Sequence, residues 1–197
     1  MKLYDAKGSP NCRKVRVAAR ELGLALELVP VDLAGTRDPE HLARNPTGKV
    51  PTLVDGEFVL WESGAILVYL AGKRPESGLL PAEAEAQAST LRWLFFAATH
   101  VQPWLSLLGQ ERILKVRAGK MPDASAIALA ERELQRFLPL LEEQLATREY
   151  LADEYSIADI ALGCGLEGCE RRGLELTPYP ALVRWRERLR QRAAWPD

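Results

Sequence analysis

The sequence lacks several features that would place the protein in a specialised class. Its first residues, MKLYDAKG, contain no apolar core of the kind that a secretory signal needs, and no apolar run approaches membrane-spanning length. Only three cysteines occur among 197 residues, widely spread, which does not predict a disulfide framework. Repeats and low-complexity tracts are missing as well. We therefore expect a cytoplasmic, reducing setting and no membrane partner.

An excess of charge of one sign is also missing. The 26 basic residues are balanced by 27 acidic ones, for a net charge of −1, which gives no electrostatic reason to expect nucleic acid as a partner. Hydrophobic residues make up 47% and charged residues 27%, a mix typical of a folded globular chain. The length suits one large domain or two small ones.

The first part of the chain, residues 1–76, predicts an α/β domain. Two β-prone runs flank Asp55-Gly56, the strongest short-range signal of a hairpin. The other elements follow from runs of apolar residues with the period of a strand or of a helix. In chain order they are a strand at 2–4, a helix at 10–22, a strand at 26–33, a helix at 39–44, the hairpin, and a third helix from Glu62, which gives the order βαβαββα.

The second part predicts only helices. Residues 77–83 lie in a segment rich in proline, glycine and serine and are expected to form a linker. Residues 84–197 show no convincing strand, and helices are expected at 84–108, 124–145, 156–171 and 179–192. Ser156 and Asp159 form a capping box, so we expect Asp159 to serve folding rather than catalysis.

The stretch GSPNCRK, residues 8–14, holds the first candidate for a functional site. Ser9 follows a strand and a loop, and Pro10 suits the first position of a helix, so Ser9 is the predicted N-cap. A thiolate bound there would gain both the helix dipole and a hydroxyl hydrogen bond, although this stretch alone favours a plain helix cap. Cys12 takes the more buried second place of a C-x-x-C spacing, so we expect no redox role for it.

A proline at a strand start supplies the next candidates. Pro51 forces Val50 into an extended conformation, which leaves the Val50 backbone free to pair with a peptide-like ligand. His41 and Lys49 flank the loop before Pro51, and they either hold a carboxylate or belong to the solvated surface. Taken alone, a proline at such a position is more commonly part of an ordinary edge strand and has no role in ligand binding.

The start of the third helix adds two more residues. Ser63 offers a hydroxyl at a helix N-terminus, which suits a carboxylate, and Glu62 beside it suits an ammonium group. Together they match the amino-acid end of a γ-glutamyl group. A routine helix cap with an acidic first turn explains the pair equally well by itself.

The stretches LYDAKGSPNCRKVRVAARELG and PEHLARNPTGKVPTL, followed by the ES helix, together resemble the glutathione S-transferases of the serine type. These are the theta, delta and phi classes and their bacterial relatives, and the resemblance covers nearly the whole chain. It implies a thioredoxin-like first domain with Pro51 as a cis-proline, followed by an all-helical domain. It assigns Ser9 as the hydroxyl that activates the glutathione thiol, and the Val50 backbone as the partner of the cysteinyl part of glutathione.

The resemblance also assigns the rest of the glutathione site. Glu62 and Ser63 would hold the γ-glutamyl end, and His41 and Lys49 would meet the glycine carboxylate. Glutathione is implied as a co-substrate, with no metal. Because the family is usually dimeric, a homodimer is expected, although the sequence itself does not show one.

The second substrate is the least defined part of this interpretation. In this family the long helix of the second domain faces the cleft, and here it offers Phe96, Thr99, His100 and Trp104, an apolar and partly aromatic set that predicts a small hydrophobic electrophile. Thiol–disulfide exchange is an alternative that would need a reactive Cys12. Isomerases and dehalogenases share the same glutathione site. A non-catalytic interaction module is a third hypothesis, but it would have no need of the glutathione-site residues.

Overall fold

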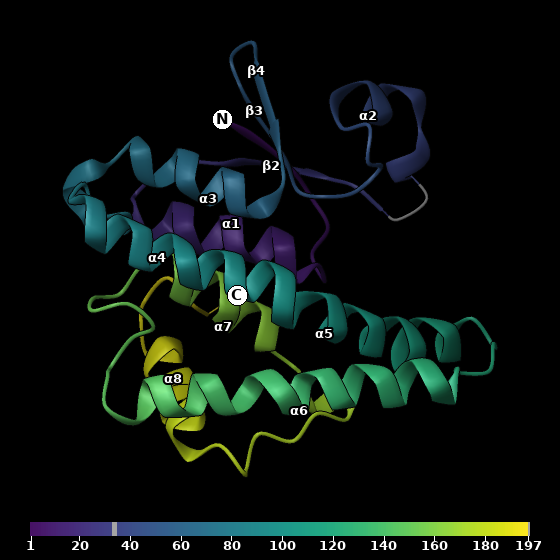
Figure 1. The fold of residues 1–197 in the computed structure, drawn as a ribbon. Helices are drawn as coiled ribbons and strands as arrows, with labels where there is room; N and C mark the ends of the chain where they lie inside the picture. Colours follow the sequence, from purple (N-terminus) through teal and green to yellow (C-terminus); the bar gives the residue numbers. More distant parts are fainter. Residues whose placement is uncertain (33–34, 197) are drawn as a thin grey trace.

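The fold was analysed in a computed structural model that describes residues 1–32 and 35–196 (Figure 1). A four-stranded sheet and the helices that accompany it form the first part of the chain, and helices form the rest. In the described ranges, no helix combines the length and the apolar character needed to cross a membrane.

The sheet has the strand order β2-β1-β3-β4. β1 (Lys2–Asp5) pairs in parallel with β2 (Glu27–Pro30) and antiparallel with β3 (Thr52–Asp55), which in turn pairs antiparallel with β4 (Phe58–Trp61). The predicted hairpin is confirmed, because Gly56 adopts a φ of 63° between β3 and β4. With its helices this sheet forms the predicted thioredoxin-like βαβαββα fold.

The predicted strand at 26–33 is shorter in the structure. β2 ends at Pro30, which pairs with Asp5, the last residue of β1, so β1 offers no further residue for β2 to pair with. Residue 33, the last of the predicted strand, lies outside the described residues.

Three helices belong to the first part: α1 (Pro10–Glu21), α2 (Pro39–Arg44) and α3 (Ser63–Gly72). α1 and α3 lie between the sheet and the helices of the second part, whereas α2 is set to one side (Figure 1). A short 3-10 turn, Gly35–Arg37, precedes α2, and another, Pro75–Ser77, follows α3. As predicted, Gly23 stops α1: it follows the C-cap residue Leu22 and has a φ of 62°.

The long helix predicted at 84–108 is present but continues further. It consists of α4 (Ala84–Phe96), a π-helical segment (Ala97–Val101), α5 (Gln102–Gly109) and a second π-helical segment (Gln110–Lys115). The first π-helical segment ends two residues before Pro103, whose ring and missing N–H are incompatible with regular α-helical bonding.

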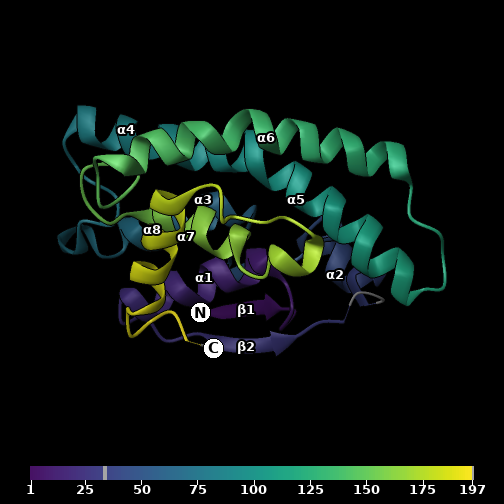
Figure 2. The same cartoon turned by 90° about the horizontal axis from the view of Figure 1, so that it is seen from below.

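The remaining helices are α6 (Ala124–Ala146), α7 (Ile157–Leu166) and α8 (Pro180–Arg190), with a 3-10 turn at Glu170–Arg172. α6 runs alongside α5, as Figure 2 shows. The prediction of a helix over 156–171 was wrong in length. α7 stops at Leu166 because Gly168 adopts a φ of 63°, a left-handed conformation that ends the helix.

The capping box at the start of α7 is confirmed. Ser156 is the N-cap, and the buried carboxylate of Asp159 accepts hydrogen bonds from the backbone N–H groups of Leu151 and Ser156, each at 3.0 Å. The indole N–H of Trp185, on α8, donates to the same carboxylate at 2.9 Å. Asp159 therefore joins α7 to α8 and to the preceding loop, which is the folding role that we expected.

α7 also forms the seam with the first part, where it packs against α1. A Cβ on Gly163 would lie 2.5 Å from the Trp195 ring and 2.6 Å from Leu189, so only glycine fits there. The segment after α8 is bound to the end of α1, because Arg192 donates to both oxygens of Glu21, at 2.7 and 3.0 Å. α1 is thus enclosed between the sheet and the helical part.

Candidate active site

The register of the sheet brings three of the predicted segments to one end. Tyr4 of β1 lies opposite Thr52 of β3, and Thr52 lies opposite Trp61 of β4. The loop after β1, the residues just before β3 and the residues just after β4 must therefore lie side by side. These are the segments that contain Ser9, Pro51 and the start of α3.

Ser9 is the N-cap of α1, as predicted. Its φ and ψ are −82° and 120°, and its Oγ accepts a hydrogen bond of 3.3 Å from the backbone N–H of Cys12. The Ser9 backbone N–H donates to the carbonyl of Ala6 at 2.8 Å, which fixes the loop before the helix. Among the described residues the half-buried hydroxyl has no acceptor for its own proton. It can donate that proton to a ligand.

A buried ion pair supports the loop that carries Ser9. Arg16 of α1 contacts the carboxylate of Asp5 at 2.5 Å, and both side chains are about one-tenth exposed or less. A second guanidinium nitrogen of Arg16 lies 3.4 Å from the carbonyl oxygen of Lys7. Because the loop is tied to the middle of α1 in this way, the position of the Ser9 hydroxyl is set by the helix itself.

Cys12 is fully buried one turn into α1. Its Sγ accepts a hydrogen bond of 3.4 Å from the backbone N–H of Ala6, and burial raises the pKa of its thiol to about 11. A thiol of this kind is a poor nucleophile at neutral pH, in keeping with the expected lack of a redox role. Within the described ranges, no three His, Cys, Asp or Glu side chains gather in a way that would hold a metal ion.

The loop before β3 contains the cis peptide bond between Val50 and Pro51 that the resemblance implied. Asn45, which sequence reasoning missed, organises this loop from inside. Its buried amide donates to the Lys49 carbonyl at 2.8 Å and to the Thr52 hydroxyl at 3.1 Å. Its side-chain oxygen accepts from the backbone N–H of Thr47, an Asx-type turn that the NPTG stretch could have indicated.

His41 and Lys49 lie on this loop in different environments. His41 is buried, and its Nε2 is 2.9 Å from the Lys49 carbonyl, so it holds the same backbone group as Asn45. The Lys49 side chain is exposed. His41 therefore braces the loop, whereas its direct contact with a glycine carboxylate stays a prediction.

Glu62 and Ser63 form the start of α3. Glu62 is exposed and adopts a φ of 72°, the one left-handed conformation among the described residues other than glycine. Such a conformation costs on the order of 1–3 kcal/mol and is concentrated at functional sites. The Glu62 carboxylate makes no capping hydrogen bond to α3, so it is available to a ligand. Ser63 follows as the first helical residue.

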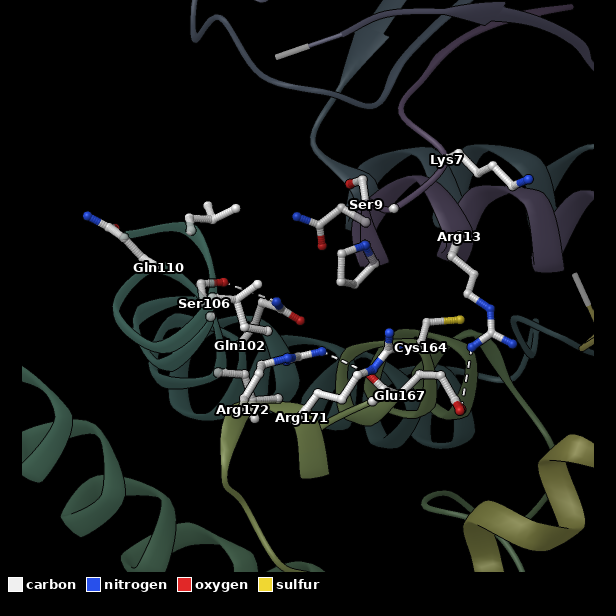
Figure 3. Close-up of a pocket in the computed structure, with 18 of the residues that line it drawn as sticks. Lys7, Ser9, Arg13, Gln102, Ser106, Gln110, Cys164, Glu167, Arg171 and Arg172 are labelled. Atoms are coloured by element: carbon white, nitrogen blue, oxygen red, sulfur yellow. Dashed lines mark hydrogen bonds and ion pairs between the residues drawn. The ribbon is translucent and has the colours of Figure 1, made fainter. Parts of the chain in front are cut away.

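Ser9 lies at the edge of a cavity of about 650 Å³ between the first turn of α1, the α5 helix and the segment after α7 (Figure 3). Gln102, Leu105 and Ser106 of α5 form one side, and the π-helical segment after Gly109 continues it. Cys164, Glu167, Arg171 and Arg172 contribute the other side from α7 and the residues beyond it.

The four residues that sequence analysis offered for this cavity do not line it. Phe96 and His100 face α6 instead, with ring centroids 5.9 Å and 4.7 Å from that of Phe137. Thr99 and Trp104 are also absent from the cavity wall. The spacing of apolar and aromatic residues could show that the helix has a buried face, but not that this face packs on α6 rather than on the cleft.

A buried lysine, Lys14, contacts two residues that line the cavity. The Lys14 ammonium lies 2.8 Å from the Asn11 side-chain oxygen and 3.4 Å from that of Gln102. Burial lowers the pKa of Lys14 to about 8, although the nearby Cys164 and Glu62 oppose that shift. Lys14 thus links α1 to α5, and no motif in the sequence indicated it.

Comparison with known proteins agrees with this geometry. Residues 3–78 match the family described as glutathione S-transferase, N-terminal domain, and residues 93–193 match glutathione S-transferase, C-terminal domain. Glutathione S-transferase 3 from Zea mays is 40% identical over 164 residues, which cover 81% of this chain and 73% of the relative.

Two further proteins are similar over nearly the whole chain. The disulfide-bond oxidoreductase YfcG from Escherichia coli (strain K12) is 37% identical over 203 aligned positions, which cover 98% of this chain and 91% of the relative. A solved structure of glutathione S-transferase-I bound with the ligand lactoylglutathione superposes with a TM-score of 0.86 at 29% identity. That match covers 98% of this chain and 95% of the other.

Proposed function

The chain belongs to the glutathione S-transferase family, and on that premise we propose that Ser9 activates the thiol of bound glutathione. The observation that carries this assignment is the Ser9 hydroxyl, which caps α1 at the cavity edge with its proton uncommitted. The thiolate then attacks an electrophile in the cavity. A carbon–sulfur bond forms, the leaving group departs with its electron pair, and the thiol proton goes to solvent.

The magnitudes support a mechanism without a general base. A free cysteine thiol titrates near ~8.5, and lowering that pKa by ~2 units requires ~2.7 kcal/mol. One hydrogen bond from a hydroxyl to a charged sulfur supplies ~1.5–3 kcal/mol, and a helix N-terminus adds ~0.3–1 kcal/mol. The Cys12 N–H that donates to Ser9 Oγ also polarises the hydroxyl, which makes it a better donor.

The remaining glutathione contacts are proposed from the segments that meet at one end of the sheet. The Val50 backbone pairs with the cysteinyl part, and Glu62 and Ser63 hold the ammonium and carboxylate of the γ-glutamyl end. Lys49 meets the glycine carboxylate. His41 acts with Asn45 through the Lys49 carbonyl, which both side chains contact.

We further propose that the protein works as a cytoplasmic homodimer. Support for pairing comes from large apolar side chains that a monomer leaves exposed, among them Phe58 and Trp61 of β4 and Phe95 of α4, which is 62% exposed. Support for a reducing setting comes from the three cysteines, which form no disulfide with one another. Sedimentation equilibrium of the purified chain tests the first of these points.

Disulfide exchange is the second candidate function, favoured by the similarity to YfcG. Cys12 does not suit the chemistry, because it is buried and its thiol pKa is raised to about 11. If this activity exists, bound glutathione itself attacks the disulfide, and Cys12→Ala leaves the rate unchanged. Loss of disulfide exchange in Cys12→Ala would restore Cys12 as the nucleophile.

The deciding experiment is an ultraviolet pH titration of the thiolate of glutathione bound to the protein. We expect a bound pKa about 2 units below that of the free thiol, and Ser9→Ala to raise it again by about 1–2 units. Turnover should fall about tenfold to a hundredfold in Ser9→Ala. Ser9→Thr, which keeps a hydroxyl and a cap, serves as the matched control and should retain most of the shift.

Two outcomes would contradict the proposal. Saturable binding with no pKa shift would leave Ser9 as a helix cap alone and the protein as a carrier or sensor of glutathione. No binding at all would favour an interaction module of the same fold.

A further inference from the structure

The cavity beside Ser9 is basic, although the chain as a whole is nearly neutral. Five cationic side chains line it, namely Lys7, Arg13, Arg117, Arg171 and Arg172. Among the described residues that line it, Glu167 is the only one with a carboxylate. Because the 26 basic and 27 acidic residues of the chain almost cancel, this is a local concentration of positive charge.

Glu167 does not neutralise this charge. Its carboxylate lies 3.4 Å from Arg13, inside the cavity, and 2.7 Å from Arg190, outside it. Burial opposes ionisation, but the hydrogen bond from Arg190 and the charges of Arg190 and Arg13 hold the pKa of Glu167 below its usual range. One carboxylate is therefore shared between two guanidinium groups, only one of which belongs to the cavity.

Among the residues that the structure describes, the other four cations have no acidic partner of their own. Arg172 is 8% exposed and donates to the carbonyl oxygens of Gly165 and Glu167, at 3.2 and 2.7 Å, which are neutral acceptors. Lys7, Arg117 and Arg171 are exposed and form no ion pair within residues 1–32 and 35–196. Figure 3 shows Arg171 and Arg172 extending from the segment after α7 into the space below Ser9.

The opposite side of the cavity has a different character. Leu105, Ile113 and Leu114, from α5 and the π-helical segment after it, provide apolar surface, and Ser106 lies among them. A ligand that fills the cavity therefore meets apolar side chains on one side and guanidinium groups on the other. Guanidinium groups bind carboxylate, sulfonate and phosphate with paired hydrogen bonds, which a purely hydrophobic ligand would leave unused.

We propose that the second substrate is an electrophile with an apolar body and an anionic group, and that Arg171 and Arg172 hold the anionic group. This inference rests on the proposed transferase function and narrows the expected class from hydrophobic electrophiles to organic anions. The apolar body lies against α5, and the reacting carbon faces the glutathione sulfur at Ser9.

The test uses two probes of equal size, a chlorodinitrobenzoate and the corresponding chlorodinitrobenzamide. In both, the thiolate forms a bond to the ring carbon that carries chlorine, chloride leaves with the electron pair, and the thiol proton passes to solvent. The measured quantity is the ratio of kcat/KM for the benzoate to kcat/KM for the benzamide, each divided by its uncatalysed rate. We expect this ratio to favour the benzoate and to fall as potassium chloride screens the cavity charges.

Arg171→Gln should lower the ratio about fivefold, because it removes one exposed charge that has no acidic partner among the described residues. The double variant Arg171→Gln/Arg117→Gln should lower it further. The matched control is Arg184→Gln, an exposed arginine of α8 that makes no ion pair in the described ranges and does not line the cavity. The ratio should not change in that control.

The outcomes separate this inference from the function on which it rests. Turnover of the benzamide with an unchanged ratio in Arg171→Gln overturns the anionic substrate and leaves the transferase intact. Absence of turnover with both probes overturns the transferase. In that case, calorimetry of the two glutathione conjugates still tests whether the cavity binds an anionic group, because it requires no catalysis. Equal affinities for the benzoate and benzamide conjugates would overturn the proposal.

Discussion

The two sides of the candidate site are built in different ways. On the glutathione side, each position depends on a short stretch of chain: Ser9 caps its own helix, and Asn45 binds residues two, four and seven positions further on. On the other side, Gln102 and Arg171 come from segments almost seventy residues apart and meet only through the packing of α5 and α7. The first side is a set of local turns, and the second is a product of tertiary structure.

This difference has consequences for how each side tolerates change. Local turns are fixed by backbone hydrogen bonds, so a single side chain that satisfies several backbone groups is hard to replace. Exposed side chains on packed helices can be exchanged without disturbing the scaffold, so they are the positions at which specificity can vary. We expect substitutions on the glutathione side to affect folding and glutathione affinity, and those on the other side to affect the choice of electrophile.

Asn45→Ala should have the largest effect on stability. It removes a buried amide that bonds Lys49, Thr52 and Thr47, and it should lower the free energy of unfolding by about 3–4 kcal/mol, with glutathione affinity lost as well. Urea unfolding measures the first effect and calorimetry the second. Gln135→Ala, an exposed amide on α6, is the control. If Asn45→Ala lowered the free energy of unfolding by less than about 1 kcal/mol, the hydrogen bonds of Asn45 would not be what fixes this loop.

Lys14→Met tests the buried contact between α1 and α5, because Lys14 should make the stability of the protein depend on pH. Lys14 has a pKa of about 8 in the folded protein against 10.5 for an ordinary lysine, so between these values only the unfolded chain carries the proton. Stability of the natural chain should therefore rise with pH across that window, by about 3 kcal/mol relative to Lys14→Met.

Urea unfolding at pH values below, within and above this window measures the difference between the two chains. Lys120→Met, which removes an exposed lysine, provides the control and should leave the pH dependence of the natural chain unchanged. Parallel curves for the natural chain and Lys14→Met would mean that the Lys14 ammonium is solvated in the folded state.

Gly163→Ala disturbs the packing of α7 against α8 and the segment after it. The new Cβ would lie 2.5 Å from the Trp195 ring and 2.6 Å from Leu189, so we expect a loss of about 2 kcal/mol in unfolding free energy. Glutathione affinity should be unchanged, because the new Cβ meets Trp195 and Leu189, neither of which lines the cavity. Gly72→Ala, where no atom lies within 4 Å of the new Cβ, should be neutral or slightly stabilising. Weaker glutathione binding in Gly163→Ala would show that the two sides are coupled.

The same difference explains what the sequence could predict. The N-cap at Ser9, the hairpin at Asp55-Gly56 and the capping box at Ser156 depend on neighbouring residues, and the structure confirms all three. The division into residues 1–76, 77–83 and 84–197 stays a prediction. Asn45 was missed although its NPTG context is local, because its three partners become visible only once the loop is folded.

The basic side of the cavity was missed for a physical reason. A helix over 156–171 would have placed Arg171 on a continuous helical surface. Gly168 ends the helix early by adopting a left-handed conformation, and the chain then turns Arg171 and Arg172 toward the cavity. Likewise, Phe96 and His100 meet Phe137 of α6 instead of the cleft, a change that follows from the way the long helix packs on α6. Periodicity carries no information about either change.

The enclosure of α1 bears on how products leave. α1 carries Ser9, packs against α3 and α7, and is bound at its far end by Arg192 through Glu21. Separation of the two parts of the chain would break the packing of α1 on α7 and the hydrogen bonds between Arg192 and Glu21 together, so we expect the two parts to stay in contact during turnover. We expect the conjugate formed by the proposed reaction to leave past the second π-helical segment, which lines the cavity and carries Leu114, a side chain that is 51% exposed. We expect movement of this segment, rather than hinging between the two parts, to accompany product release.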